Sequence, residues 1–316
     1  MGKTIVSFIK NWILVIAMAT GAAAYLIYHQ IPALHPAGPV LERICLTLQP
    51  LLLFAMLFLS FCKIEPHQLK PHRWQFILLG IQTLMFLLFA VLVYLRPEGD
   101  LWRIPLEAAM LVLICPTANA CAVVTGKLGG DMAGVVTYTV LINLLVAVAM
   151  PAVIPFIHPI EGLPFNLAFN HFLVKVFPLL ILPCLCAWLI RYVFPRLHRR
   201  ILHHVGLSFY LWAFCLSLAI LMCTRSIVHS PAPGATLGIL AAVALLVCIF
   251  NFGTGRLVGS FFKCTVSAGQ ALGQKNTILV IWMAYTFMDP VSSVVGGFYS
   301  IWQNIFNSWQ LSRKNQ

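Results

Sequence analysis

Long apolar stretches separated by short polar segments follow one another along nearly the whole chain. Each is about as long as the roughly 20 residues that a helix needs to cross a bilayer. The strict alternation of apolar and polar residues that marks strands is missing, and lipid offers a spanning backbone no partner outside its own helix. The pattern therefore predicts an all-α polytopic membrane protein with ten transmembrane helices, at about residues 11–28, 44–62, 75–95, 104–127, 132–157, 168–193, 205–225, 234–255, 266–288 and 291–311.

The composition supports this class and excludes several others. Of the 316 residues, 61% are hydrophobic and 9% are charged, with a mean hydropathy of +0.93, whereas soluble domains carry about 25% charged residues. So few charges could not cover the surface of a cytosolic enzyme of this size. The chain has no GxxxxGK[ST] run to hold a nucleotide phosphate, so we do not expect ATP-driven pumping. Ten cysteines lie mostly within apolar stretches as buried small residues, and we expect no metal or other cofactor.

The basic residues assign the loops to the two sides of the membrane. With the N-terminus in the cytoplasm, fourteen of the 20 lysines and arginines fall on the cytoplasmic side and four outside, while Lys175 and Lys275 fall inside spans. This bias follows the positive-inside rule and predicts that both termini are cytoplasmic. It also accounts for the net charge of +12 without nucleic acid as a partner.

The ten stretches divide into two sets of five. The fifth ends near residue 157 and the sixth begins near residue 168. Because five is odd, the second set enters the membrane with the opposite orientation, which is the arrangement of an inverted repeat. We therefore expect one membrane domain built from two five-helix repeats, residues 1–160 and 161–316.

Two of the apolar stretches are interrupted by polar residues. The fourth contains Pro116, which removes a backbone donor, followed by Thr117 and Asn119. The ninth contains a polar cluster from Gly273 to Thr277, which begins 157 residues after Pro116. A single proline kink is commonly structural, but interruptions at corresponding places in two repeats are typical of a transporter's binding site.

Several motifs resemble the bile acid:sodium symporter family of secondary transporters, in its bacterial branch. The similarity runs from about residue 44 to 311 and is carried by Pro50–Phe58, Gln82, Pro116–Asp131, Gly273–Thr277, and Pro290 with Tyr299–Asn304. The resemblance implies alternating-access transport of a small organic anion in the bacterial cytoplasmic membrane. It also implies a mobile panel of spans 1, 2, 6 and 7 and a core of spans 3–5 and 8–10, with the broken spans 4 and 9 crossing in the core. Auxin-efflux-type carriers have a similar Pro-Thr-Ala start to their broken helix and remain an alternative, as does a facilitator or sensor on the same scaffold.

The chain departs from this family where its members bind sodium. Relatives place a Ser-Asn pair after the proline, and the corresponding residues here are Cys121 and Ala122. The family's glutamate and glutamine in span 9 correspond to Ala271 and Lys275. Sodium requires several oxygen ligands, which alanine and cysteine do not supply. Candidate coupling residues are therefore limited to Gln82, Cys121, Thr139, Asn143, Gln274 and Lys275, and we do not expect sodium coupling of the usual kind.

Lys275 is the most informative of these residues. A lysine within a span costs roughly 3 kcal/mol on insertion scales and is usually functional. We expect its ammonium to replace a sodium ion, to attract an anionic substrate, or to carry a proton; the alternative is that it only reaches toward water or pairs with an acid. The substrate site predicted around it consists of Thr117, Asn119, Lys275, Asn276 and Gln303.

Four other charged residues lie at or near span ends. We expect Glu107 at the membrane interface rather than in a proton site, and Lys175 to extend toward the interface. Asp131 is an expected N-cap of the fifth span, and Asp289 is expected to cap or turn the chain before Pro290. With eight acidic residues widely scattered, a membrane-embedded enzyme is not expected. The expected partners are a small organic anion and the bilayer, with no obligate protein partner.

Overall fold

The computed structural model describes residues 2–203, 207–229 and 234–314. This part of the chain is helical, with fourteen α-helices and three short 3-10 helices. The α-helices are α1 (Gly2–Gln30), α2 (Gly38–Cys62), α3 (Arg73–Tyr94), α4 (Arg103–Ile114), α5 (Cys121–Lys127), α6 (Met132–Ile157), α7 (Phe165–Leu180), α8 (Leu182–Val193), α9 (Pro195–His203), α10 (Leu207–His229), α11 (Gly234–Phe261), α12 (Thr265–Gly273), α13 (Thr277–Phe287) and α14 (Val294–Lys314). The 3-10 helices are η1 (Pro32–Ala37), η2 (Pro66–Gln68) and η3 (Pro290–Ser293). The predicted all-helical class is confirmed.

Five helical stretches are long and apolar enough to cross a membrane by themselves. They are Pro32–Cys62, Arg73–Tyr94, Met132–Ile157, Tyr210–His229 and Gly234–Phe261. A sixth span arises if α7 and α8, which meet at an angle of 42°, are taken together. The protein is thus a multi-pass membrane protein with five or six candidate spans of this kind, and the ten-span repeat stays a prediction.

The two interruptions expected in the sequence are present in the structure. The first separates α4 from α5, and the second separates α12 from α13. The 12 residues of α4 give a length of about 18 Å, at 1.5 Å per residue, against a hydrocarbon thickness of about 30 Å. The helices on either side of each interruption therefore end inside the protein. At these ends the terminal backbone groups need partners outside their own helix.

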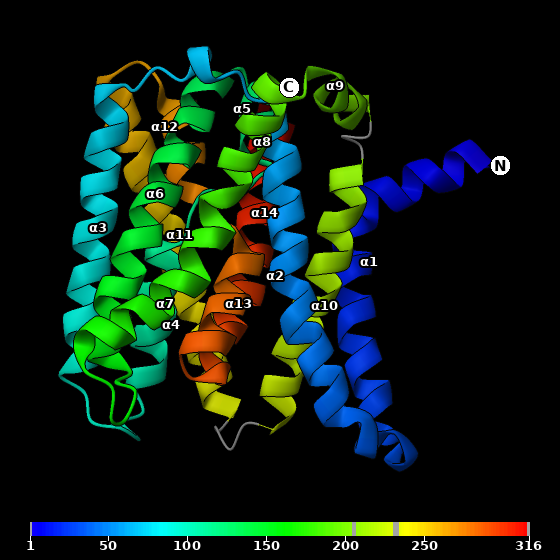
Figure 1. The fold of residues 1–316 in the computed structure, drawn as a ribbon, viewed down its shortest axis with the longest axis vertical. Coiled ribbons are helices and arrows are strands. Elements are labelled where there is room, and N and C mark those ends of the chain that lie inside the picture. The colour runs from blue at the N-terminus through cyan, green and yellow to red at the C-terminus, as the bar shows by residue number, and fades with distance from the viewer. Residues whose placement is uncertain (1, 204–206, 230–233, 315–316) are drawn as a thin grey trace.

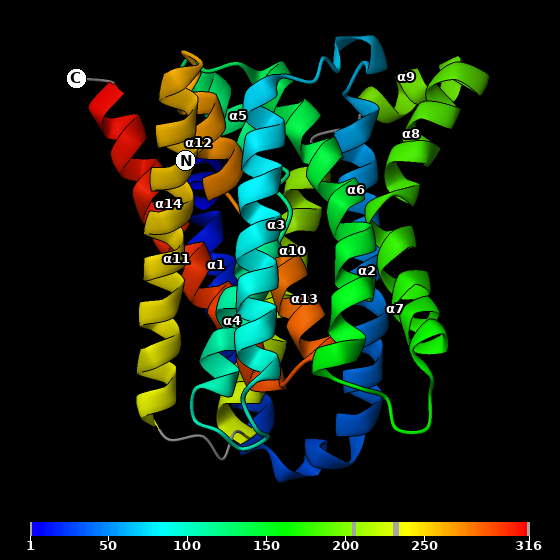
Figure 2. The same cartoon turned by 90° about the vertical axis from the view of Figure 1, so that its left-hand side faces the viewer.

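The helices run mostly along the long axis of the molecule (Figures 1 and 2). On one side α10 packs along α1 and α2, and α2 also packs against α8. On the other side α11 packs against α12, α14 and α4, while α3 packs against α4 and α6. The helices α6 and α7 join the two sides.

The close contact between α11 and α12 depends on small residues. A Cβ atom at Gly255 would lie 2.5 Å from the backbone oxygen of Ala268, and one at Gly259 would lie 2.8 Å from the Ala268 Cβ. Glycines four residues apart allow two membrane helices to approach until their backbones touch. This contact holds α12, and with it the second interruption, against a long apolar helix.

One helix was not expected from the sequence. The segment after α8, which lies between two predicted spans and is rich in basic residues, contains α9 at Pro195–His203. It lies at the end of the molecule where α5 and α12 are also found (Figures 1 and 2). Arginine favours helices, and the apolar residues of this segment recur with helical spacing, which agrees with the helix that is found.

Candidate functional site

The two interruptions meet inside the protein. An isolated antiparallel bridge pairs Thr117 in the first with Lys275 in the second. Two backbone hydrogen bonds of 2.9 Å flank it, from Ala118 N to Gln274 O and from Asn276 N to Pro116 O. Backbone groups that the broken helices leave unpaired are thus satisfied by each other. The extended segments form a small crossover between residues about 157 positions apart in sequence.

Thr117 strengthens this crossover through its side chain. Its hydroxyl donates to the Ala271 carbonyl at 2.7 Å, and the residue is buried. The Cys115 thiol similarly donates to the Asn276 carbonyl at 3.2 Å. Asn276 caps α13, because its side-chain oxygen accepts from the backbone N–H of Leu279 at 3.3 Å. All three side chains are therefore engaged with the backbone of the crossover.

The Lys275 ammonium lies at the C-terminal end of α4. Lys275 is only 1% exposed, and its Nζ donates to the carbonyl oxygens of Leu113 at 3.3 Å and Cys115 at 3.0 Å. The Gln82 amide donates to the neighbouring carbonyls of Ile114 at 2.9 Å and Cys115 at 3.1 Å. The C-terminal end of a helix carries partial negative charge, which a cation stabilises. No ion pair to Lys275 is present among the described residues, so these carbonyls are its partners.

Gln82 is held in place by a residue that the sequence did not single out. The hydroxyl of Tyr138, which is fully buried, donates to the Gln82 side-chain oxygen at 2.7 Å. This contact leaves the amide nitrogen of Gln82 directed at the carbonyls of α4. A buried tyrosine three helices away in sequence gives no signal of such a role by itself.

Gln303 contacts the backbone of Lys275 rather than its ammonium. Its oxygen accepts from Lys275 N at 2.9 Å, and its amide nitrogen donates to Lys275 O at 3.3 Å. The side chain of Gln303, on α14, therefore pairs with this peptide as a neighbouring strand would. The crossover is held from the side opposite Thr117.

A line of buried amides continues from Gln303 along α12 and α14. Gln274 donates to Gln270 at 2.7 Å, and Gln270 donates in turn to Asn307 at 3.2 Å and Gln310 at 2.6 Å. Residues 303, 307 and 310 share one face of α14, as their spacing requires. Of this set the sequence had singled out only Gln274 and Gln303.

The remaining candidates are distributed around the crossover. The Cys121 thiol is buried and contacts the Thr125 hydroxyl at 4.0 Å. Thr139 bonds the Val135 carbonyl of its own helix at 2.9 Å. Asn143 is 2% exposed, and its side-chain nitrogen has no hydrogen-bond partner in the described part of the chain. Such a buried donor is unusual and is available to a substrate oxygen or a water molecule.

A cavity of about 300 Å³ opens beside the first interruption. It lies between the end of α2, α5 and α6, and Asn119 and Thr139 both line it. Most of the wall is apolar, and Lys63 is its one charged residue among those described. The Lys63 ammonium has no hydrogen bond or ion pair to another described residue, and partial desolvation lowers its pKa below the ordinary value. In the sequence Lys63 serves only to assign topology, because its position in a basic loop does not show which side chains surround it.

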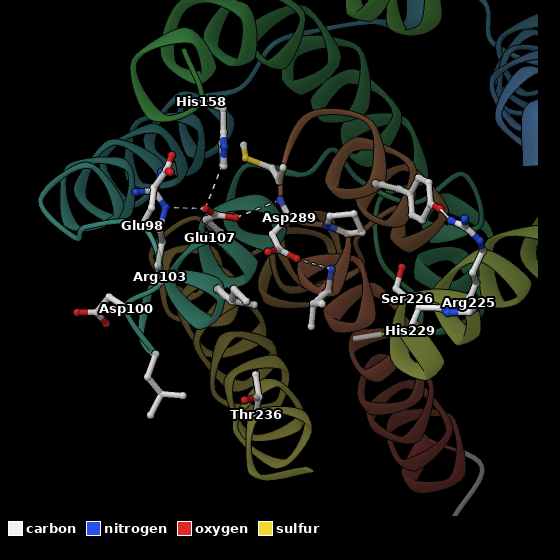
Figure 3. A pocket seen from close by; sticks show the side chains of 17 residues that line it. Glu98, Asp100, Arg103, Glu107, His158, Arg225, Ser226, His229, Thr236 and Asp289 are labelled. Atoms are coloured by element: carbon white, nitrogen blue, oxygen red, sulfur yellow. Dashed lines mark hydrogen bonds and ion pairs between the residues drawn. The ribbon is translucent and has the colours of Figure 1, made fainter. Parts of the chain in front are cut away.

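A second cavity, of about 730 Å³, lies at the opposite ends of the helices (Figure 3). Glu107 is 1% exposed in its wall. One carboxylate oxygen accepts from Arg103 at 3.3 Å and His158 at 3.0 Å, and the other accepts from the Ser292 hydroxyl at 3.2 Å. Glu107 is therefore buried within the protein, where partners on α4, on η3 and at the C-cap of α6 compensate its burial. Its depth in the membrane stays a prediction.

The same cavity is bordered by a second charged group. Arg225 on α10 donates both terminal nitrogens to the Glu42 carboxylate, at 2.7 and 2.9 Å. Tyr285 on α13 donates to Glu42 at 2.9 Å and accepts from Arg225. This group joins α2 and α10 to α13 across the width of the molecule.

Three further expectations have mixed outcomes. Asp289 caps η3 through a bond from Val291 N at 2.8 Å, as predicted. Asp131 occupies the N-cap position of α6, but no capping bond reaches its side chain. Lys175 is exposed, as a lysine extending from its helix requires, and lies over the Phe287 ring at 5.8 Å.

The described residues contain no cluster of histidine, cysteine or acidic side chains that could hold a metal ion.

Comparison with known families identifies the class of protein. Residues 50–230 match the model of the Sodium Bile acid symporter family, which is more than half of the chain. The chain belongs to this family. A sodium bile acid symporter family protein is a secondary transporter of a small solute and not an enzyme. The match runs from within α2 to the end of α10 and includes the first interruption, but it stops before the second. A search of curated proteins found no match.

Proposed function

We propose that this member of the sodium bile acid symporter family moves a small organic anion by alternating access, with Lys275 in place of a bound sodium ion. The observation that carries the proposal is the position of the Lys275 ammonium on the Leu113 and Cys115 carbonyls. A cation on these carbonyls stabilises the end of α4 and the crossover beside it. The Lys275 ammonium is covalently attached to the chain, so it stabilises this helix end without a bound sodium ion.

The residues around the ammonium support the absence of a sodium site. Ala271 and Cys121 stand where the resemblance aligns residues with oxygen ligands, and neither supplies one. Gln82 already donates its amide hydrogens to carbonyl oxygens, so it presents donors rather than an acceptor to this place. Transport is then either proton-coupled through Lys275 or uncoupled, and the experiment below separates these cases.

The cavity beside the first interruption is the proposed substrate site in this conformation. Lys63 supplies a positive charge without a partner in the described part of the chain, and Asn119 and Thr139 supply polar groups. The predominantly apolar wall suits an organic body rather than an inorganic ion. Lys275 lies behind the crossover and contributes positive potential to the anion without direct contact.

The proposed architecture is the ten-span inverted repeat, with residues 1–160 and 161–316 as its halves. Support comes from the two interruptions, each falling in the fourth helical region of its half. The contacts of α2 with α8 and α10, and of α10 with α1, agree with a panel of spans 1, 2, 6 and 7. We propose the cytoplasmic membrane of a bacterium as the location, with both termini in the cytoplasm, on the charge bias of the loops.

Uptake into proteoliposomes tests the proposal. A set of labelled small monocarboxylates is supplied with a sodium gradient, with a pH gradient, or with neither. We expect wild-type protein to transport at least one anion without sodium, and Lys275→Gln protein to lose that uptake unless sodium restores it. Strict sodium dependence of the wild type would overturn the proposal. So would normal, still proton-dependent transport by Lys275→Ala protein. Accumulation against a gradient separates a transporter from a facilitator.

A further inference from the structure

The unexpected helix α9 has a sharply divided surface. At about 100° per residue, Arg196, Arg199, Arg200 and His203 fall within one arc of about 100° on the helix. The opposite arc carries Leu197, His198, Ile201 and Leu202. A helix with basic residues on one face and apolar residues on the other is typical of segments that lie in the plane of a membrane surface.

Contacts with the rest of the protein fix which face of α9 points outward. His198 is buried, and its Nε2 lies 2.9 Å from the Cys62 carbonyl at the end of α2. Ile201, on the same face, is half-buried and packs against the hydrophobic core. Because the arginines occupy the opposite face, they point away from the protein.

The arginines of α9 have no partners in the part of the chain that the structure describes. Arg196, Arg199 and Arg200 are exposed, and no ion pair or hydrogen bond joins their side chains to other described residues. The sequence contains no aspartate or glutamate between Glu161 and Asp289, so no acid nearby in sequence neutralises them. Three adjacent guanidinium groups therefore remain available to an external anion.

Exposed apolar side chains border this basic face. Leu197 is 46% exposed and Leu202 is 39% exposed, and Phe194, which links α9 to α8, is 54% exposed. The helix follows the end of α8, the second part of a candidate membrane span (Figure 1). Apolar residues at this level enter the boundary of the acyl chains and bring the arginines to the depth of the headgroups.

We propose that α9 binds the headgroups of anionic phospholipids in the leaflet that it faces. Guanidinium groups bind phosphate oxygens in a bidentate manner, and the apolar border favours a lipid over a soluble acidic partner. Because α9 follows α8 directly and contacts α2, bound lipid fixes the end of this group of helices in the bilayer. The inference depends on the membrane position of α8 and not on the transported solute, so it can fail while the proposed function stands.

Lipid retention by purified protein tests this inference. Delipidated full-length protein in neutral detergent is titrated with dioleoylphosphatidylglycerol or dioleoylphosphatidylcholine, and bound lipids are counted by native mass spectrometry. The variant carries Arg196→Gln, Arg199→Gln and Arg200→Gln. Each surface cation contributes about fivefold to the affinity for anionic lipid, so we expect a loss on the order of a hundredfold for phosphatidylglycerol. If the triple variant does not fold, Arg199→Gln alone is measured instead, and we expect its affinity for phosphatidylglycerol to fall about fivefold.

A matched variant removes the same charge elsewhere. Lys70→Gln, Arg256→Gln and Lys263→Gln change three exposed cations outside α9, and we expect phosphatidylglycerol binding to stay within about threefold of wild type. An equal loss in this control would overturn the assignment to α9. Equal retention of the two lipids by wild-type protein, or unchanged binding by the α9 variants, would also overturn it. Displacement of the lipid by equimolar inorganic phosphate would show a simple anion site instead.

Discussion

Replacing Gln303 with leucine tests how the crossover is held. Leucine has nearly the volume of glutamine, so the change removes two hydrogen bonds and leaves little empty space. The N–H and C=O of Lys275 have no other partner among the described residues, and Lys275 is 1% exposed. Water therefore cannot replace the lost bonds in the structure as it stands.

The magnitude follows from these two backbone groups. A buried polar group left without a partner costs about 1–3 kcal/mol. The bond to Lys275 O is the longer, at 3.3 Å against 2.9 Å to Lys275 N, and we assign it the lower end of that range. Gln303→Leu should then lower the free energy of unfolding by about 2–4 kcal/mol.

The measurement is equilibrium unfolding in mixed micelles, followed by tryptophan fluorescence. Asn304→Leu is the control, since among the described residues the Asn304 amide bonds only the Ser300 carbonyl of its own helix. We expect this control to cost less than about 1 kcal/mol. If Gln303→Leu is as stable as the control, the Lys275 peptide has another partner and the reasoning about the crossover is refuted.

Three further changes address the cavities. Lys63→Gln should weaken anion binding at least tenfold, whereas Lys70→Gln should not. Because desolvation lowers the pKa of Lys63, wild-type protein should lose anion binding at a pH below the one at which an ordinary lysine loses its proton. Glu107→Gln should destabilise the protein by about 1–3 kcal/mol in the same unfolding assay, because it removes the anion that the half-buried Arg103 guanidinium pairs with, whereas exposed Glu98→Gln should be neutral. Tyr285→Phe should increase thiol labelling of a Ser226→Cys variant, whose new thiol lines the larger cavity, since it removes the hydroxyl that joins α13 to α2 and α10; unchanged labelling would show that this contact does not close the cavity.

The helices and their interruptions could be predicted from local signals. A proline and a polar cluster within apolar stretches mark where α4 and α12 end, because each removes or competes for backbone hydrogen bonds. The sequence also indicated Lys275 as functional, since a lysine in a span is costly unless it is used. These signals act over a few residues and can be read without knowing the fold.

The contacts of the polar side chains could not be predicted in the same way. Glu107 is buried because His158 and Ser292 approach it from 51 and 185 positions away in sequence. Gln303 was proposed as a substrate ligand, whereas its hydrogen bonds go to the Lys275 backbone, which no residue pattern reveals. The sequence around Lys63 is that of an ordinary basic loop, and only the fold shows that Lys63 lines a cavity with residues of α5 and α6.

The crossover also constrains the order in which this protein folds during its synthesis. The backbone of the first interruption is completed by residues 274–276, which leave the ribosome more than 150 residues later. Until then Gln82, which is already synthesised, is the side chain able to bond the Ile114 and Cys115 carbonyls in the membrane. A nascent chain released before residue 274 therefore holds a helix end that lipid cannot satisfy. Such truncated chains should be preferred targets of membrane quality-control proteases, while chains that extend past α14 should escape them.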